Sequence, residues 1–226
     1  MSAPRQLAFD LGLQENLSRD GFFPSGANAA GLAAIAAWQG WPQRRHLLIG
    51  PAGAGKTHLA HIWAAEAGAE ILRATTLPHY DPTSLPTHLV VEDADEMAGL
   101  PAHEEALFHA LNHQLASGGT LLITARTPPR DWGLALPDLL SRAQSIAIAR
   151  LDAPDDALLS AVLVKLFADR QIAVPPNLIP YLAARMDRSI AAARHLVAAL
   201  DARALALGRP VTRALAAELL DSPDQG

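Results

Sequence analysis

The chain has 226 residues, half of them apolar, which allows a packed core and suits one mid-sized domain or a larger domain with a small satellite. The net charge of −5, with sixteen arginines and two lysines, argues against a broad electrostatic grip on nucleic acid but leaves a local basic patch open. Because the sequence has no cysteine, disulfides, cysteine-based zinc sites and thiol nucleophiles are excluded.

The beginning of the sequence has no apolar segment typical of a signal peptide. No stretch reaches the roughly 18 apolar residues that a membrane span needs. We therefore expect a soluble, cytoplasmic protein without a membrane partner.

The stretch from residue 1 to about 18 carries one compact apolar cluster in polar surroundings. We interpret it as a flexible tail with a docking peptide, and we assign partner binding to Gln6, Leu7, Phe9 and Leu11. The alternative is a frayed terminus whose apolar side chains pack onto their own domain. Docking of this peptide alone would be weak, because ordering the residues offsets most of the free energy gained by burying them.

An alanine-rich helix is predicted over residues 28–38, after a turn that contains Phe22 and Phe23. Aromatic residues just before the first helix of a nucleotide-binding domain either line the adenine pocket or belong to the core. Phe23 is our candidate for the pocket, and the alternative stays open. The first strand is predicted over residues 46–49.

A glycine-rich loop follows this strand and matches the phosphate-binding pattern G-x-x-x-x-G-K-[ST] at every position. Glycines let successive backbone N–H groups approach a phosphate, and the positive end of the next helix adds to the attraction. Lys56 supplies a charge for the outer phosphates, and the Thr57 hydroxyl is a candidate Mg²⁺ ligand. We assign nucleotide binding to Gly50, Pro51, Ala52, Gly53, Ala54, Gly55, Lys56, Thr57 and His58.

A buried strand predicted over residues 88–92 ends in a cluster of acids. We assign Glu92 and Asp93 as the catalytic carboxylates that meet the magnesium ion and the attacking water, with Glu92 as a metal ligand beside Thr57. Because a glutamate stands first, its reach to the metal is one methylene longer, and the division of work between the two acids stays open. The alternative is a solvated acidic helix cap.

The other elements of this region are strands over residues 70–73, 119–124 and 145–149 and helices over residues 101–117 and 136–142. Thr124 stands at the polar end of its strand, where a hydroxyl can sense the γ-phosphate or water. The alternation of strands and helices after a phosphate loop predicts an α/β fold, with a parallel five-stranded sheet flanked by helices, over residues 19–150.

From about residue 151 the pattern changes to helix after helix. Four helices are predicted, over residues 154–169, 176–186, 189–207 and 211–220. We expect residues 151–226 to form a helical lid that follows the nucleotide-binding base.

A P-loop domain followed by a helical lid resembles the AAA+ plan. Three segments look like the nucleotide-binding module of the bacterial replication initiator DnaA: residues 20–28, residues 50–61, and the Leu-Pro-Asp-Leu-Leu-Ser-Arg segment that ends at Arg142. DnaA continues into a helix-turn-helix domain that binds the origin, whereas this sequence stops at the lid. Together with the Gln-Leu tail, this arrangement resembles the Hda family of DnaA inactivators over roughly residues 5–220.

The resemblance implies roles for particular residues. The tail peptide would dock on the sliding clamp, the beta subunit of DNA polymerase III, and the loop would hold ADP or ATP with Mg²⁺. Arg142 matches the arginine finger that projects into a neighbour's nucleotide. Arg194 matches the sensor 2 arginine of the lid, which reaches back to the phosphates. Residues 124–129 lack the acidic residue of the initiators, so the resemblance implies weak ATP hydrolysis by this chain itself.

The function implied is negative regulation of replication initiation. With the DNA-loaded clamp, the protein would stimulate ATP hydrolysis by DnaA by supplying Arg142 in trans. No direct sequence-specific DNA binding is expected, and a homo-oligomer is compatible with this plan. Three alternatives stay open: a nucleotide-binding adaptor that recruits DnaA or another replication factor without catalysis, a generic AAA+ ATPase or loader, and a stand-alone P-loop enzyme such as a small-molecule kinase.

Overall fold

A parallel sheet of five strands forms the centre of the protein. The computed structural model describes residues 17–221, and the strands within them are β1 (Arg45–Ile49), β2 (Glu70–Arg73), β3 (His88–Glu92), β4 (Thr120–Ala125) and β5 (Ala147–Arg150). Their order across the sheet is β2-β3-β4-β1-β5, and every neighbouring pair is parallel. The carboxyl ends of β3, β4 and β1 therefore lie side by side at one edge, which is where ligands of such sheets bind.

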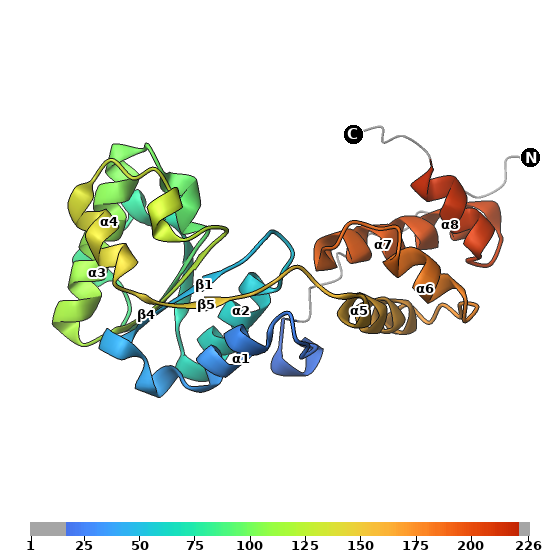
Figure 1. The fold of residues 1–226 in the computed structure, drawn as a ribbon, viewed down its shortest axis with the longest axis horizontal. Coiled ribbons are helices and arrows are strands. Elements are labelled where there is room, and N and C mark those ends of the chain that lie inside the picture. Colours follow the sequence, from blue (N-terminus) through green and yellow to red (C-terminus); the bar gives the residue numbers. More distant parts are fainter. Residues whose placement is uncertain (1–16, 222–226) are drawn as a thin grey trace, which may run out of the picture.

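Helices cover both faces of the sheet (Figure 1). They are α1 (Ala29–Ala36) and α2 (Lys56–Ala67) on one face and α3 (Pro101–Ser117) and α4 (Pro137–Gln144) on the other. Successive strand side chains point to opposite faces, so Leu48 and Leu122 pack in one core with α1 and α2, while Leu47 and Ile123 pack in another with α3 and α4. The predicted α/β fold is confirmed.

Four helices after β5 pack around a core of their own. They are α5 (Asp156–Asp169), α6 (Leu178–Ala183), α7 (Ile190–Leu207) and α8 (Arg213–Leu220). Fully buried side chains such as Leu159, Leu182, Val197 and Leu200 form this core. Figure 1 shows the four helices gathered at one end of the molecule, joined to the sheet by an extended segment after β5.

All four helices begin one or two residues later than the sequence pattern indicates, and for three of them a polar residue just before the helix acts as the cap. The side chains of Asp155, Ser189 and Thr212 each accept a hydrogen bond from the backbone N–H three residues further on. Helix α6 follows Asn177, whose side chain makes no such bond, and it is the shortest of the four.

Helix α4 and strand β5 differ from the sequence expectation. The sequence predicts a helix that ends at Arg142, but α4 continues to Gln144, and β5 begins at Ala147. The hydroxyl and the N–H of Ser145 both donate to the Arg142 carbonyl, at 2.6 and 3.1 Å, and so extend the helix by part of a turn. Arg142 therefore lies within the last turn of α4.

Several connections contain short 3-10 helices, among them two in the proline-rich segment after β2, which the sequence predicts as a plain loop. They are Arg19–Gly21, Trp38–Gly40, Pro42–Arg44, Ala74–His79, Pro82–Ser84, Ala94–Met97 and Pro129–Asp131. The residues assigned to clamp docking lie outside the described residues; they are Gln6, Leu7, Phe9 and Leu11. Within residues 17–221, no helix has the length and apolar character needed to cross a membrane.

Candidate nucleotide-binding site

The glycine-rich loop runs from the end of β1 to the start of α2. A Cβ added to Gly50 would lie 2.4 Å from the carbonyl oxygen of Leu151, and one added to Gly53 would lie 2.5 Å from the Cβ of Ser189. Gly53 and Gly55 also have φ values of 73° and 100°, a region that favours glycine. The loop therefore packs tightly against the segment after β5 and the start of α7.

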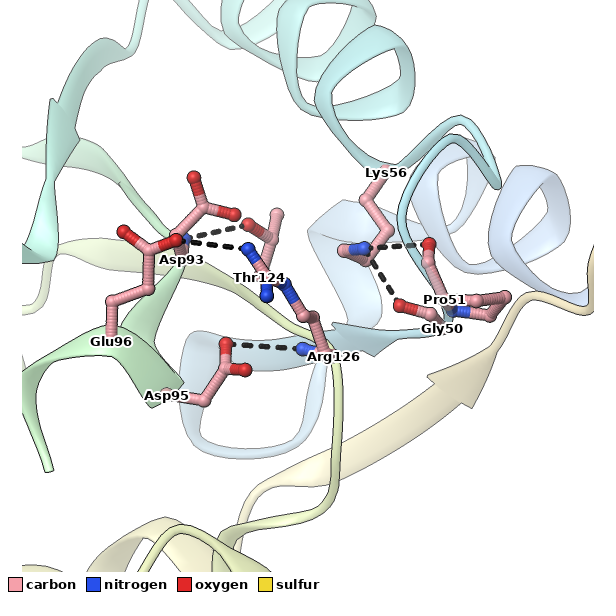
Figure 2. Close-up of polar contacts among 8 residues, drawn as sticks. All are labelled: Gly50, Pro51, Lys56, Asp93, Asp95, Glu96, Thr124 and Arg126. Carbon is pink, nitrogen blue, oxygen red and sulfur yellow. Dashed lines mark hydrogen bonds and ion pairs between the residues drawn. The ribbon is translucent and has the colours of Figure 1, made fainter. Parts of the chain in front are cut away.

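Lys56 folds back over this loop (Figure 2). Its ammonium group donates hydrogen bonds to the carbonyl oxygens of Gly50, at 2.7 Å, and Pro51, at 3.0 Å. The residue is 7% exposed. Since an ammonium has three N–H donors, these two bonds leave one donor for a phosphate oxygen.

The carboxylate of Glu92 ends β3 and points to the sheet face that α2 covers. Side chains two residues apart in a strand point to the same face, so Glu92 shares the face of Val90. Val90 packs in one core with Leu59 of α2. It is 8% exposed, and its Oε1 has no hydrogen-bond partner within the described part of the chain. A buried carboxylate oxygen without a partner is costly, so this atom and the exposed Thr57 at the start of α2 fit the oxygen ligands that Mg²⁺ prefers.

Asp93 follows directly in a left-handed conformation, with φ of 54°. Its N–H donates to the hydroxyl of Thr124 at 3.1 Å, which ties the end of β3 to the end of β4. Thr124 is 1% exposed. The structure thus gives the Thr124 hydroxyl a partner in the protein and leaves the Asp93 carboxylate at the carboxyl edge of the sheet.

The charges at this edge act on one another. Burial lowers the pKa of Lys56, Asp93 and Asp95 raise it, Arg126 lowers it and Glu92 raises it. Lys56 therefore shares one electrostatic environment with the acids after β3 and with the arginine that follows β4. A site of this kind favours a phosphate group that arrives together with a divalent cation.

Helix α7 closes one side of the cleft beside the phosphate loop. The Ile190 N–H donates to the Gly53 carbonyl at 3.3 Å. The cleft has a volume of about 240 Å³, and its lining residues are Leu17, Gly53, Gly55, Lys56, Thr57, His58, Ile190, Ala191 and Arg194. The structure therefore brings together the loop and Arg194, which are far apart in the sequence.

The two aromatic residues before α1, one of which is the candidate for the adenine pocket, lie in different surroundings. Phe23 is not among the described residues that line the cleft, and it packs against the core of the four C-terminal helices. Phe22 instead packs against the His58 ring in a T-shaped arrangement, with ring centres 5.1 Å apart. A Cβ on Gly55 would lie 3.6 Å from Phe22, so Phe22 is the aromatic residue that contacts the phosphate loop.

Arg142 lies away from this cleft. Its guanidinium carbon is 5.4 Å from the ring centre of Phe108 on α3. Arg45 is buried, and its pKa is lowered by this burial and, to a smaller extent, by the charge of Arg142. Arg45 begins β1, whereas the phosphate loop follows the other end of that strand. At about 3.3 Å per residue, roughly 15 Å of strand separates the two ends.

The sequence did not single out several residues of this site. Leu17 and Ile190 are ordinary apolar residues in their local sequence, and only the packing of the chain brings them to the loop. The sequence does indicate three other residues by their positions. Arg126 is the first charged residue after β4, and Asp95 and Glu96 are the first charged residues after Asp93.

No protein-family model matches this chain. Domain III of the Thermotoga maritima replication initiation protein DnaA is similar in structure, with 18% identity, a TM-score of 0.80, and coverage of 92% of this chain and 96% of that one. AMPPCP-bound DnaA from Aquifex aeolicus is also similar, with 14% identity, a TM-score of 0.70, and coverage of 84% of this chain and 66% of that one. The Thermotoga maritima RuvB Holliday junction branch migration motor has 22% identity and a TM-score of 0.69, with coverage of 92% of this chain and 74% of that one.

The chain has the AAA+ fold. Identities at this level establish the arrangement of the sheet and helices and leave the chemistry to be argued from the site. In this fold, Lys56, Arg194 and the glycines of the loop lie around one cleft, and they are the candidates for binding phosphates. Thr57 and Glu92 are the oxygens available to a magnesium ion.

Proposed function

We propose that this protein binds ADP or ATP with Mg²⁺ at residues 50–57, between a base of residues 19–150 and a lid of residues 151–226. The loop N–H groups and Lys56 hold the phosphates, and Arg194 meets them from the lid. Thr57 and Glu92 hold the magnesium ion, which spreads the negative charge of the outer phosphates, and Asp93 orients a water molecule. The support is the cleft that joins the loop to α7, together with the Glu92 Oε1 atom, which has no hydrogen-bond partner among residues 17–221.

We further propose that the protein regulates replication initiation by stimulating ATP hydrolysis by DnaA. The observation that carries this proposal is the position of Arg142, which is half-buried in the last turn of α4, just before the start of β5, at the end of the sheet opposite the phosphate loop. In this proposal the Arg142 guanidinium serves a nucleotide bound to a neighbouring molecule rather than the one in its own cleft. An arginine supplied in trans accelerates phosphoryl transfer by about 10³–10⁵-fold.

Recruitment to the DNA-loaded sliding clamp is assigned to Gln6, Leu7, Phe9 and Leu11 on the strength of the sequence resemblance. The clamp gathers several protein molecules in one place, which compensates for the weakness of a short docking peptide. Deletion of residues 1–11 is expected to remove clamp-dependent stimulation while leaving nucleotide binding unchanged.

The decisive experiment measures ATP hydrolysis by DnaA with DNA-loaded clamp, with and without this protein. The wild-type protein is expected to accelerate hydrolysis, and Arg142→Ala is expected to lose at least 100-fold of that acceleration. Arg130→Ala is the matched control, because Arg130 is an exposed arginine whose ion-pair partner in the described chain is its neighbour Asp131, at 3.5 Å.

The outcomes separate the candidate functions. Unchanged DnaA hydrolysis on adding the wild-type protein would exclude the stimulatory function. Stimulation that survives Arg142→Ala would favour an adaptor that recruits DnaA without contributing to the chemistry.

A further inference from the structure

Two arginines among the four C-terminal helices, Arg185 and Arg213, stack on one tyrosine ring. Their guanidinium carbons lie 4.2 and 4.6 Å from the ring centre of Tyr181. Tyr181 belongs to α6, Arg185 follows the end of that helix, and Arg213 is the first residue of α8. Both arginines are exposed, whereas Tyr181 is half-buried against the core of these helices. The ring therefore holds two like charges together at the surface.

The pair has no carboxylate partner within residues 17–221. Arg188, three residues after Arg185, differs because its guanidinium donates to Asp156 at 2.8 Å. The distance between the guanidinium carbons of Arg185 and Arg213 cannot exceed the sum of their distances to the ring, which is less than the Debye length of about 10 Å at 0.1 M salt. The two charges therefore repel each other, and an anion bound by both would relieve that repulsion.

The sequence keeps acids away from this surface. Neither residues 170–186 nor residues 202–217 contain an aspartate or a glutamate, and these segments include α6 and the first half of α8. Their basic residues are Arg170, Arg185, Arg203, Arg209 and Arg213. Figure 1 shows α6 and α8 at the end of the molecule away from the sheet. The arginine pair thus lies apart from the candidate nucleotide site.

The chemistry of the pair fits a chain of phosphates. Each planar guanidinium can donate two parallel hydrogen bonds to phosphate oxygens. The Tyr181 ring already stacks with the arginines, so it is not free to stack on a base, and contacts to the backbone alone carry no sequence information. Because the whole chain has a net charge of −5, a polyanion can approach it closely only where the surface is locally basic.

We propose that Arg185 and Arg213, held on Tyr181, form a surface that binds the phosphate backbone of DNA without sequence preference. The choice of DNA among polyanions rests on the proposed function, which brings the protein to a DNA-loaded clamp. Contact of this surface with the same DNA would add a second attachment to that of the docking peptide. Two weak attachments on one assembly bind more tightly than either alone.

The test is a titration of the full-length protein into a fluorescent DNA duplex of mixed sequence, between about 50 and 200 mM salt. Two phosphate contacts predict that the logarithm of the affinity falls with the logarithm of the salt concentration with a slope of about −2. Arg185→Ala and Arg213→Ala are each expected to weaken binding about fivefold at the lower salt concentration and to reduce the slope by about 0.9. Tyr181→Leu keeps the charges but removes the ring, and we expect a loss of about twofold.

Arg188→Ala is the matched control, because it removes the same charge from an exposed arginine that already has an acidic partner. We expect it to bind the duplex within about twofold of the wild-type protein. Tyr181→Phe keeps the ring and is expected to leave binding unchanged. Thermal unfolding and ATP binding show whether each variant retains its fold and its nucleotide site.

Three results would overturn the proposal: wild-type affinity of Arg185→Ala and Arg213→Ala, an equal loss for Arg188→Ala, or displacement of the duplex by polyglutamate as effective as displacement by unlabelled duplex. The last result would indicate a surface for acidic peptides. The outcome is separable from that of the proposed function. If the arginine pair binds the duplex but the protein does not stimulate DnaA, the proposed function is wrong and the DNA-binding surface stands.

Discussion

The two ends of strand β1 carry cations in opposite surroundings. At the carboxyl end, Lys56 donates hydrogen bonds to loop carbonyls, and the charges of the acids at and after the end of β3 raise its pKa against the effect of burial. At the other end, neither Arg45 nor Arg142 has an ion pair with any of residues 17–221, and the two arginines repel each other. The first arrangement suits a site that encloses its own anion, and the second suits an arginine offered to an anion outside the chain.

The difference also lies in how each end is held. The phosphate loop is held by the lid, through the Ser189 contact with Gly53 and the Ile190 hydrogen bond. Arg142 is held by α3, which places Phe108 under its guanidinium. One end of the sheet therefore depends on the relative position of base and lid, and the other depends on packing within the base.

The largest expected effect is at Lys56. Lys56→Ala removes the buried charge of the phosphate loop and is expected to weaken binding of ATP and ADP at least 100-fold, as measured by titration with a fluorescent nucleotide. Lys165→Ala is the matched control, because Lys165 is the chain's other lysine and pairs on α5 with Asp169 at 3.9 Å. Similar affinities for the two variants would contradict the assignment of the site.

Replacement of Glu104 tests how α4, the helix that contains Arg142, is held in place. This α3 carboxylate is 1% exposed and accepts hydrogen bonds from the N–H groups of Gly99, Ala135 and Leu136, at 2.8 to 3.2 Å. Leu136 precedes α4, and its side chain makes no capping hydrogen bond. Glu104 therefore supplies the acceptor for the backbone N–H groups where this helix begins.

Glu104→Ala is therefore expected to lower the free energy of unfolding by about 3 kcal/mol, measured by denaturant titration. Glu105→Ala, at the exposed neighbouring position, is expected to change it by less than about 0.5 kcal/mol. Equal effects of the two variants would mean that the start of α4 does not depend on this carboxylate.

Gly53 tests the contact between the loop and the lid. Gly53→Ala places a Cβ at a positive φ and against Ser189, whereas Gly68→Ala places one at a φ of 67° with no atom within 4 Å. Both are expected to lose about 1 kcal/mol of stability from backbone strain, and Gly53→Ala about 1 kcal/mol more. Thermal unfolding of both variants measures the difference, and its absence would show that the lid does not press on the loop.

The smallest expected effect is at His46, near the start of β1, where it stacks on Trp41 with ring centres 5.2 Å apart. Burial lowers the pKa of His46 from its ordinary value of 6.5. Below about pH 6.5 the unfolded chain binds a proton that the folded protein does not, so the free energy of unfolding falls as the pH falls.

His46→Phe keeps a ring for the stack and is expected to reduce this fall by about 1 kcal/mol between about pH 7.5 and about pH 5.5. Denaturant titration at the two pH values is the measurement, and His79→Phe, at an exposed position, is the control. If His46→Phe leaves the pH dependence of the free energy of unfolding unchanged, that dependence comes from other groups.

Sequence patterns determined the architecture well because the signals are local. The apolar runs before the phosphate loop and before Glu92 identify buried strands, and β2, β3 and α3 have the bounds that the sequence predicts. Several helix boundaries shifted where a polar side chain caps or extends the helix, as Ser145 does for α4, and β1 and β4 each shifted by one residue.

The candidate site was predictable to the extent that its residues are contiguous. Residues 50–57 follow from one motif, and Glu92 and Asp93 follow from their place at the end of a strand. Phe22 and Phe23 are adjacent in the sequence, and nothing local indicates which of the two meets the loop.

The sequence by itself therefore determined the AAA+ α/β plan, the phosphate loop and the acids opposite it. Only the tertiary structure decided that Arg194 reaches the loop, that Arg142 lies at the far end of β1, and that Arg126 pairs with Glu96. The physical reason is that side-chain periodicity and turn chemistry act over a few residues. Contacts between residues 30 or more positions apart depend on how the strands and helices pack together.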